Sequence, residues 1–142
     1  MRSVRTVAHE LPVRLVLSHD LSVSIPAALQ YDADDPYAVR AVFHPLNQNG
    51  TVEWFLSRDM VAQALSEHTG QADVRMWPTS DSGRDVVRMV LSSPAGSALL
   101  EFPAQSVESF LRETQSAVPP GTESSRFDLD AELAQLLAEK ST

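Results

Sequence analysis

The sequence predicts an α+β domain with a curved, barrel-like antiparallel sheet of seven strands and three helices. Seven stretches carry apolar residues at every second position or in short unbroken runs, as the strands of a sheet do. Turn-forming residues separate these stretches. Three further segments repeat their apolar residues at helical spacing.

Four strands are expected before residue 57. In the first, Leu11, Val13 and Leu15 alternate with proline or arginine, which is the period of a half-buried strand. Pro26 in the second strand indicates an edge position or a bulge, because proline cannot donate to a neighbouring strand. The segment PLNQNG supplies a hairpin turn between the third and fourth strands. The four strands are expected at residues 11–17, 24–31, 36–44 and 51–56.

A helix is expected after the fourth strand. Ser57 is a suitable N-cap, and Asp59 lies in the first turn, where a negative charge favours the helix dipole. Gly70 is expected to end this helix. A second helix is expected over residues 104–115, and a third begins at Asp128. The apolar stripe of the third helix is Leu129, Leu133, Leu136 and Leu137. The remaining strands are expected at residues 73–77, 84–92 and 97–102.

The chain is expected to form a single domain over residues 1–142, with flexible ends at 1–10 and 139–142. A chain of this length can bury roughly two-thirds of its unfolded surface. Its first residues lack the apolar core and cleavage site of a signal peptide. The longest uncharged run, residues 89–100, is shorter than the ~20 apolar residues that a membrane helix needs. We therefore expect a cytoplasmic protein with no direct membrane insertion.

Several of the expected strands are apolar on both faces. Val86 is followed by Val87, and Trp54 is followed by Phe55. A sheet with one face in water would alternate apolar and polar residues instead. Three helices cover only one face, so the other must be covered by the sheet closing on itself or by a neighbouring subunit. We favour a homo-oligomer.

The residue pattern contains no arrangement typical of an enzyme or a cofactor site. The glycines are all more than ten residues apart, whereas dinucleotide and phosphate loops need closely spaced glycines. The chain has no cysteine, which excludes disulfides, zinc ribbons and thiol nucleophiles. The histidines, at 9, 19, 44 and 68, lack the short spacings that place two imidazoles on one metal. We expect no catalytic residue, no metal and no cofactor.

Asp32, Asp34 and Asp35 form a cluster of carboxylates that could be a metal-binding loop, a catalytic pair or a charged turn. A calcium loop of the EF-hand type that began at Asp32 would need glycine at position six and a bidentate acid at position twelve. Those positions hold Tyr37 and Phe43. A pair of carboxylates could instead act in glycoside hydrolysis. Asp35 precedes a proline, however, and this context favours turns, so we interpret the cluster as a solvated turn.

Arginines on the expected strands are the one possible signal for nucleic acid: Arg14, Arg40, Arg75 and Arg88. Together with aromatic side chains they could stack bases and bind phosphates of a single strand; these aromatic residues are Tyr37, Trp54 and Trp77. Alternatively, the arginines pair with carboxylates on neighbouring strands or across a subunit contact, namely Glu53, Asp73, Asp85 and Glu101. The net charge of −8 favours the pairing. Nucleic acid is therefore not an expected partner.

Six segments, taken in order, resemble the SsgA-like proteins of sporulating actinomycetes. The segments are QYDADDPYAVRAVFH (30–44), TVEWFLSRDMVAQAL (51–65), GQADVRMWP (70–78), LSSPAGSALLEFP (91–103), SFLRET (109–114) and AVPPGTE (117–123). The resemblance runs from about residue 11 to residue 138. Agreement of many motifs in the same order is far more specific than any single motif.

The resemblance implies a small, non-enzymatic regulator of cell division. Within this family, a member marks future septum sites during sporulation and recruits the tubulin-like protein FtsZ there, promoting its polymerisation. Other division proteins, including SsgA, are further implied partners. The family fold is similar to that of the Whirly single-stranded nucleic-acid binders, with subunits assembled through intertwined sheets, and three subunits are implied. A Whirly-like single-strand binder is therefore the alternative function.

Overall fold

One antiparallel sheet runs through the part of the chain that the computed structural model describes, residues 6–46, 49–126 and 136–137. In chain order its strands are β1 (Thr6–Ser18), β2 (Leu21–Asp32), β3 (Ala38–Phe43), β4 (Val52–Ser57), β5 (Thr69–Gln71), β6 (Val74–Asp81), β7 (Arg84–Ser93) and β8 (Gly96–Pro103). The helices are α1 (Arg58–Gln63) and α2 (Ala104–Ala117), followed by the 3-10 helix η1 (Glu123–Arg126). In this described part, no helix is long and apolar enough to cross a membrane.

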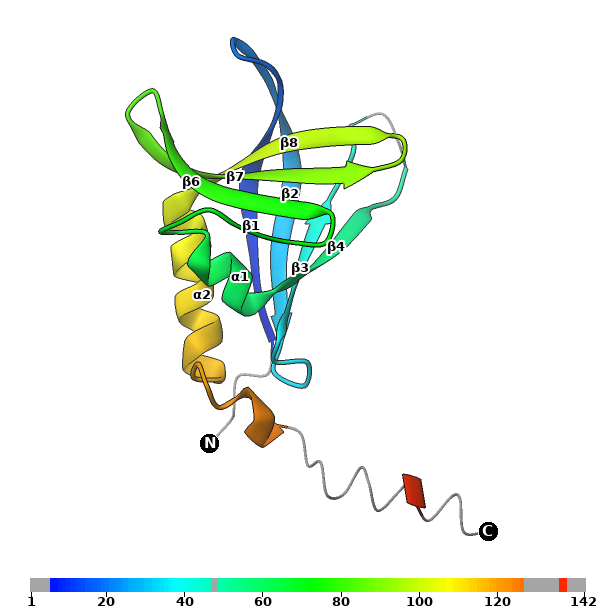
Figure 1. Cartoon of the computed structure of the whole chain (residues 1–142), viewed down its shortest axis with the longest axis vertical. Helices are drawn as coiled ribbons and strands as arrows, with labels where there is room; N and C mark the ends of the chain where they lie inside the picture. The colour runs from blue at the N-terminus through cyan, green and yellow to red at the C-terminus, as the bar shows by residue number, and fades with distance from the viewer. Residues whose placement is uncertain (1–5, 47–48, 127–135, 138–142) are drawn as a thin grey trace.

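The sheet consists of two four-stranded halves that are joined by a short ladder. The strand order is β4-β3-β2-β1-β8-β7-β6-β5. The central β1–β8 ladder contains only three residue pairs, Arg14 to Val16 opposite Leu99 to Glu101. Figure 1 shows the consequence, because β6, β7 and β8 run across the direction of β1 and β2. The sheet therefore curls into a half-barrel.

The hairpin of β1 and β2 is longer than the strands beside it. The two strands pair with each other from Thr6 opposite Asp32 to Ser18 opposite Leu21. Pairing of β2 with β3 begins at Ala27, and the His44 N–H donates to the Pro26 carbonyl at 3.0 Å, so Pro26 lies at the end of the β2–β3 ladder. This position explains why a proline is tolerated in an otherwise interior strand. Residues 17–24 project beyond the sheet as a two-stranded arm, seen at the top of Figure 1.

The core fills the concave side of the half-barrel. Helix α2 packs against β1, β7 and β8, and α1 packs against β3, β4 and β5. Alternate strand residues point inward, as the period of a strand requires. The most completely buried apolar side chains of the core include Val13, Val39, Val61, Val87, Met89, Val107, Phe110 and Val118. The two helices thus cover the inner apolar face at one end of the half-barrel.

Helix α1 begins as predicted and ends earlier. The Ser57 hydroxyl accepts a hydrogen bond from the Met60 N–H at 3.2 Å, and Asp59 lies in the first turn. The helix closes at Gln63, however, and Gly70 belongs to β5 instead of ending the helix. A Cβ at Gly70 would lie 2.9 Å from the Val74 carbonyl oxygen. Because glycine has no side chain, β5 can pair closely with β6. The sheet therefore has eight strands, and the prediction of seven was wrong.

The other predicted boundaries have mixed outcomes. The second helix is confirmed, since α2 begins at Ala104 and extends two residues further than expected, to Ala117. The prediction of a flexible end over residues 1–10 was wrong for residues 6–10. Those residues belong to β1 because Val7 is buried and pairs with Tyr31. The third helix, predicted from Asp128, and the end at 139–142 lie outside the described residues, apart from Leu136 and Leu137.

One buried guanidinium connects α1 to the end of α2. Arg58 is 2% exposed. Its Nη1 donates to the carbonyls of Thr114 and Val118, at 3.1 and 2.8 Å, at the C-terminal end of α2. Its Nη2 donates to Glu123 Oε2 at 2.8 Å, and its guanidinium lies 5.1 Å from the centre of the Tyr31 ring. The segment after α2 is therefore fixed against the end of the sheet at Tyr31.

Glu123 completes this network from the other side. The Gly121 N–H donates to Glu123 Oε1 at 2.9 Å, so both carboxylate oxygens accept hydrogen bonds. The hydrogen bond from Arg58 holds the pKa of Glu123 below its ordinary value of 4.5, and hydrogen bonds to backbone N–H groups act in the same direction. The carboxylate is therefore held in its charged form.

Replacing Arg58 with methionine is expected to lower the free energy of unfolding by about 3–5 kcal/mol, because the change leaves the Glu123 carboxylate buried without its partner. Urea denaturation followed by circular dichroism measures this. The matched control is Arg112→Met, which breaks the exposed pair of Arg112 and Glu108 on α2. The control is expected to cost less than about 1 kcal/mol. Equal losses in the two variants would contradict the importance of the buried pair.

Acid is expected to weaken the fold through Glu123. Its folded-state pKa lies below 4.5, so the unfolded chain takes up a proton at a higher pH than the folded chain does. The stabilisation is therefore fully present above that ordinary pKa and is lost as pH falls through the folded-state pKa. Glu123→Gln is expected to flatten the fall in stability below about pH 4.5, measured as urea midpoints across pH. An unchanged slope would refute this role.

Candidate partner-docking surfaces

The aspartate cluster lies in the turn between β2 and β3, as predicted. The Asp35 N–H donates to the Asp32 carbonyl at 2.9 Å, and the Asp34 N–H donates to Asp32 Oδ1 at 2.8 Å. These are the hydrogen bonds of a turn closed by an aspartate side chain. Within the described ranges, no group of three or more candidate ligand residues could hold a metal ion. The aspartate cluster therefore stabilises the turn between β2 and β3.

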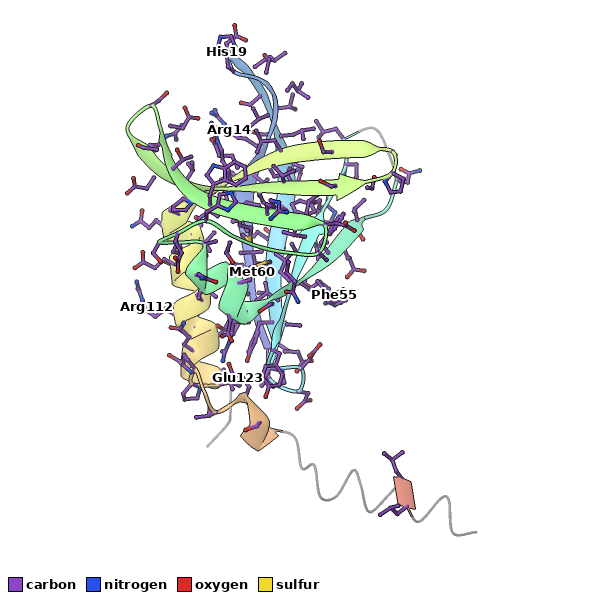
Figure 2. All side chains as sticks on the ribbon, viewed as in Figure 1. Arg14, His19, Phe55, Met60, Arg112 and Glu123 are labelled. Atoms are coloured by element: carbon purple, nitrogen blue, oxygen red, sulfur yellow. The ribbon has the colours of Figure 1, made fainter. Side chains whose placement is uncertain are left out.

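The four histidines lie far apart on different elements. His9 on β1 contacts Glu113 of α2 and meets the Phe110 ring edge-on at 5.6 Å. His68 stacks on Trp77, with ring centres 5.4 Å apart and planes within 7°. His19 lies at the tip of the arm, as Figure 2 shows. His44 follows β3, where its N–H donates to the Pro26 carbonyl. The side chains of His9 and His68 therefore make contacts within the fold, and the four histidines are not gathered at one site.

The strand arginines are partly neutralised by acidic neighbours. Arg40 pairs with Glu53 at 3.2 Å, and Arg88 pairs with Glu101 at 3.0 Å. These two pairings were predicted. Arg14 and Arg75 make no ion pair in the described part of the chain, so the expected pairings with Asp73 and Asp85 are absent there.

Of the aromatic residues proposed to accompany the arginines, Trp77 shares a face of the sheet with Arg14 and Arg88, whereas Trp54 does not. Trp77 lies opposite Arg88 in the β6–β7 ladder and stacks on His68. Trp54 lines a groove on the inner side of the half-barrel. Tyr37 is half exposed in the turn before β3. The face that carries Trp77, Arg14 and Arg88 also carries Glu101, which lies opposite both arginines and pairs with Arg88. Its positive charge is therefore partly neutralised, and Trp54 adds no second ring to it.

An exposed aromatic side chain marks the free edge of the sheet at β4. Phe55 is 67% exposed and, in Figure 2, projects outward from β4. It lies opposite Arg40 in the β3–β4 ladder, beside the Arg40–Glu53 ion pair. A shallow pocket of about 280 Å³ extends from Phe55 over Arg40 and Gln30. We call Phe55, Arg40, Glu53 and Gln30 the β4 face. It has an apolar centre with polar residues beside it, which is the usual arrangement of a docking surface.

A second apolar surface lies at the end of the half-barrel that α1 and α2 leave uncovered. This groove has a volume of about 660 Å³. Its apolar walls come from three hairpins, through Leu15, Val23 and Ile25 of β1–β2, Phe43, Val52 and Trp54 of β3–β4, and Leu91, Ala98 and Leu100 of β7–β8. None of its lining residues is charged. We call it the mouth groove.

The strands that are apolar on both faces now have a partial explanation. Val87 and Met89 point into the core, so the curled sheet itself covers that face. Val86 on the opposite face is still only 8% exposed. The apolar surface that stays exposed includes Phe55 on the β4 face, the wall of the mouth groove, and Leu17 and Leu21 on the arm. The adjacent Trp54 and Phe55 indicated the exposed β4 face from the sequence. No sequence pattern indicated the mouth groove, because three hairpins that are distant in the chain build it.

The chain matches known proteins along most of its length. Residues 25–123 match the family described as Streptomyces sporulation and cell division protein, SsgA. The sporulation-specific cell division protein SsgB of Streptomyces coelicolor is 54% identical over 134 residues, which covers 94% of this chain and 97% of that protein.

Two solved structures have the same fold. A structure of SsgB from Streptomyces coelicolor superposes with a TM-score of 0.82 at 52% identity, covering 86% of this chain and 95% of that chain. An SsgA-like sporulation-specific cell division protein from Thermobifida fusca superposes with a TM-score of 0.83 at 36% identity, covering 95% and 98%. The half-barrel and its helices are therefore shared with these proteins. This chain belongs to the SsgA family of sporulation and cell division proteins.

Proposed function

We propose that this protein is a non-enzymatic regulator that marks septum sites during sporulation and recruits FtsZ there, promoting its polymerisation. It acts in the cytoplasm at future division sites, as a homo-oligomer of three subunits, together with other division proteins that include SsgA. The observation that carries the proposal is the 54% identity to SsgB of Streptomyces coelicolor over 94% of this chain. FtsZ is proposed as the partner because the sequence motifs resemble those of the SsgA-like proteins.

The side chains with reactive groups support docking in preference to catalysis. The clustered carboxylates form the bonds of a turn, and the buried pair of Arg58 and Glu123 holds the end of α2 in place. The exposed features are the apolar surfaces of the β4 face and the mouth groove. Surfaces of this kind on a soluble protein mark contacts with other proteins.

The β4 face suits a partner that is itself acidic. The chain has a net charge of −8, which repels another acidic protein at long range. On the β4 face, the charges of Arg40 and Glu53 cancel, and Phe55 supplies the apolar centre. An apolar contact of this kind depends little on salt. Several copies of the face on one oligomer would bind a polymer more tightly than one copy alone, because later contacts form within the same complex.

Phe55→Ser is expected to reduce binding to FtsZ polymers by about tenfold or more, because an exposed aromatic anchor contributes roughly 2 kcal/mol or more at the centre of an interface. Co-sedimentation with polymerised FtsZ measures the bound fraction at low and moderate salt. Arg112→Ser is the control, since the Arg112 side chain is also exposed, at 69%, but lies on α2. Absence of the unchanged protein from the pellet at both salt concentrations would remove direct recruitment.

Single-stranded nucleic acid is the competing partner, from the Whirly-like alternative. We expect no binding to labelled single strands in fluorescence anisotropy, because Arg40 and Arg88 are paired with carboxylates and the chain is acidic overall. Binding that weakens steeply with salt would support the alternative. Arg75→Glu would then test the Trp77 side of the sheet, with Arg112→Glu on α2 as control.

A further inference from the structure

The mouth groove is an extension of the core that nothing in the described chain covers. Its walls continue the inner apolar face of β1 and β2, where Val13 is fully buried and Leu15 is only partly buried. The same face continues along the arm to Leu17 and Leu21, which are both 56% exposed. A two-stranded ribbon is only marginally stable in water by itself. An apolar partner over the groove would stabilise both the groove and the arm.

The chain carries an apolar stripe that needs such a surface. Leucines 129, 133, 136 and 137 have the spacing of one face of a helix. Leu136 and Leu137, the two members that the structure describes, are 60% and 63% exposed. We call these four residues the leucine stripe. A helix with such a stripe gains most of its stability by packing it against another apolar surface.

A helix that continued directly from residue 126 would not carry the leucine stripe to the mouth groove of the same chain. Arg58 fixes Glu123 beside Tyr31, which pairs with Val7, whereas the groove lies at Leu15, eight residues along β1. Eight strand residues span about 26 Å. In a helix that continues from residue 126, the stripe would lie only about 5–17 Å from that residue. Figure 1 also shows η1 at the end of the molecule opposite the arm.

Charge does not oppose contact between two copies at this place. Residues 127–142 contain four acidic residues and one lysine, so the segment is acidic, like the whole chain. The residues that line the mouth groove carry no charge. Association through the groove would therefore bring an apolar stripe to an uncharged wall.

We propose that the mouth groove binds the leucine stripe of the C-terminal segment, residues 127–142, of a second copy of this chain. The inference rests on the homo-oligomer of the proposed function and identifies the contact that builds it. Each copy gives its segment to one neighbour and receives a segment from another. Such a head-to-tail contact forms a closed ring when the rotation between copies closes.

Cross-linking between two differently tagged forms of the full-length chain tests this contact. The chain has no cysteine, so single cysteines can be placed at will. One form carries Val52→Cys in the groove, where Val52 is 41% exposed. The other carries Ala138→Cys beside the stripe. The forms are mixed and treated with a short bis-maleimide, and mass spectrometry identifies the joined peptides. Ser80→Cys, on an exposed part of β6 outside the groove, replaces Val52→Cys in the control.

The expected result is a cross-link that joins Val52→Cys of one copy to Ala138→Cys of the other, with none from Ser80→Cys. Leu136→Ser together with Leu137→Ser is expected to reduce its yield by about tenfold or more, because each leucine removed from an apolar contact weakens it substantially. Gln135→Ser, next to the stripe, is the matched control and should leave the yield unchanged. A yield that is equal in the leucine variant and its control would overturn the proposal.

Light scattering of the unchanged chain separates this inference from the proposed function. An oligomer without the Val52–Ala138 cross-link would overturn the exchange of C-terminal segments and leave the homo-oligomer standing. A cross-link confined to one chain, found when both cysteines are placed in a single copy, would also overturn it. A monomer at micromolar concentration would overturn both the exchange and the homo-oligomer, whereas recruitment of FtsZ is decided separately by co-sedimentation.

Discussion

Burial of one guanidinium organises the closed end of this molecule. Arg58 begins α1, yet its hydrogen bonds go to the last turn of α2 and to Glu123 beyond it. A buried charge is tolerated only when it is paired and fully hydrogen-bonded, so these partners must stay together. The two helices are thereby fixed over the same end of the curled sheet. The inner apolar face is covered at that end and stays open at the other.

The open parts of the sheet are therefore consequences of how the closed end is built. Short α1 and fourteen-residue α2 cover the core near Met60 and Phe110, and the three hairpins that end beyond them form the mouth groove. In the described part of the chain, β4 is an edge strand, and Phe55 projects from its outer face into water. A sheet that ends at free edges and an uncovered apolar end offers contacts to other chains. The proposed docking role in cell division depends on such contacts.

Local sequence signals were reliable where the physics is local. Ser57 caps α1 because its side chain reaches an N–H three residues away, and the aspartate cluster closes its own turn. The predictions that were wrong concern segments whose structure depends on contacts with distant residues. Gly70 looked like a helix end, but its missing Cβ admits a short edge strand beside β6. Residues 6–10 looked like a loose end, but Val7 packs opposite Tyr31, which lies far along the chain.

By itself the sequence determined the sheet with its main helices, the absence of cysteine chemistry and the family, because strand periodicity, turn residues and ordered motifs are properties of neighbouring residues. Only the tertiary structure decided where apolar surface remains exposed. The β1–β8 ladder has three residue pairs, and this short junction sets the curl that separates the covered end from the mouth groove. Contacts between residues as distant as Arg58 and Glu123 leave no periodic pattern. Their effect appears only when the chain is folded.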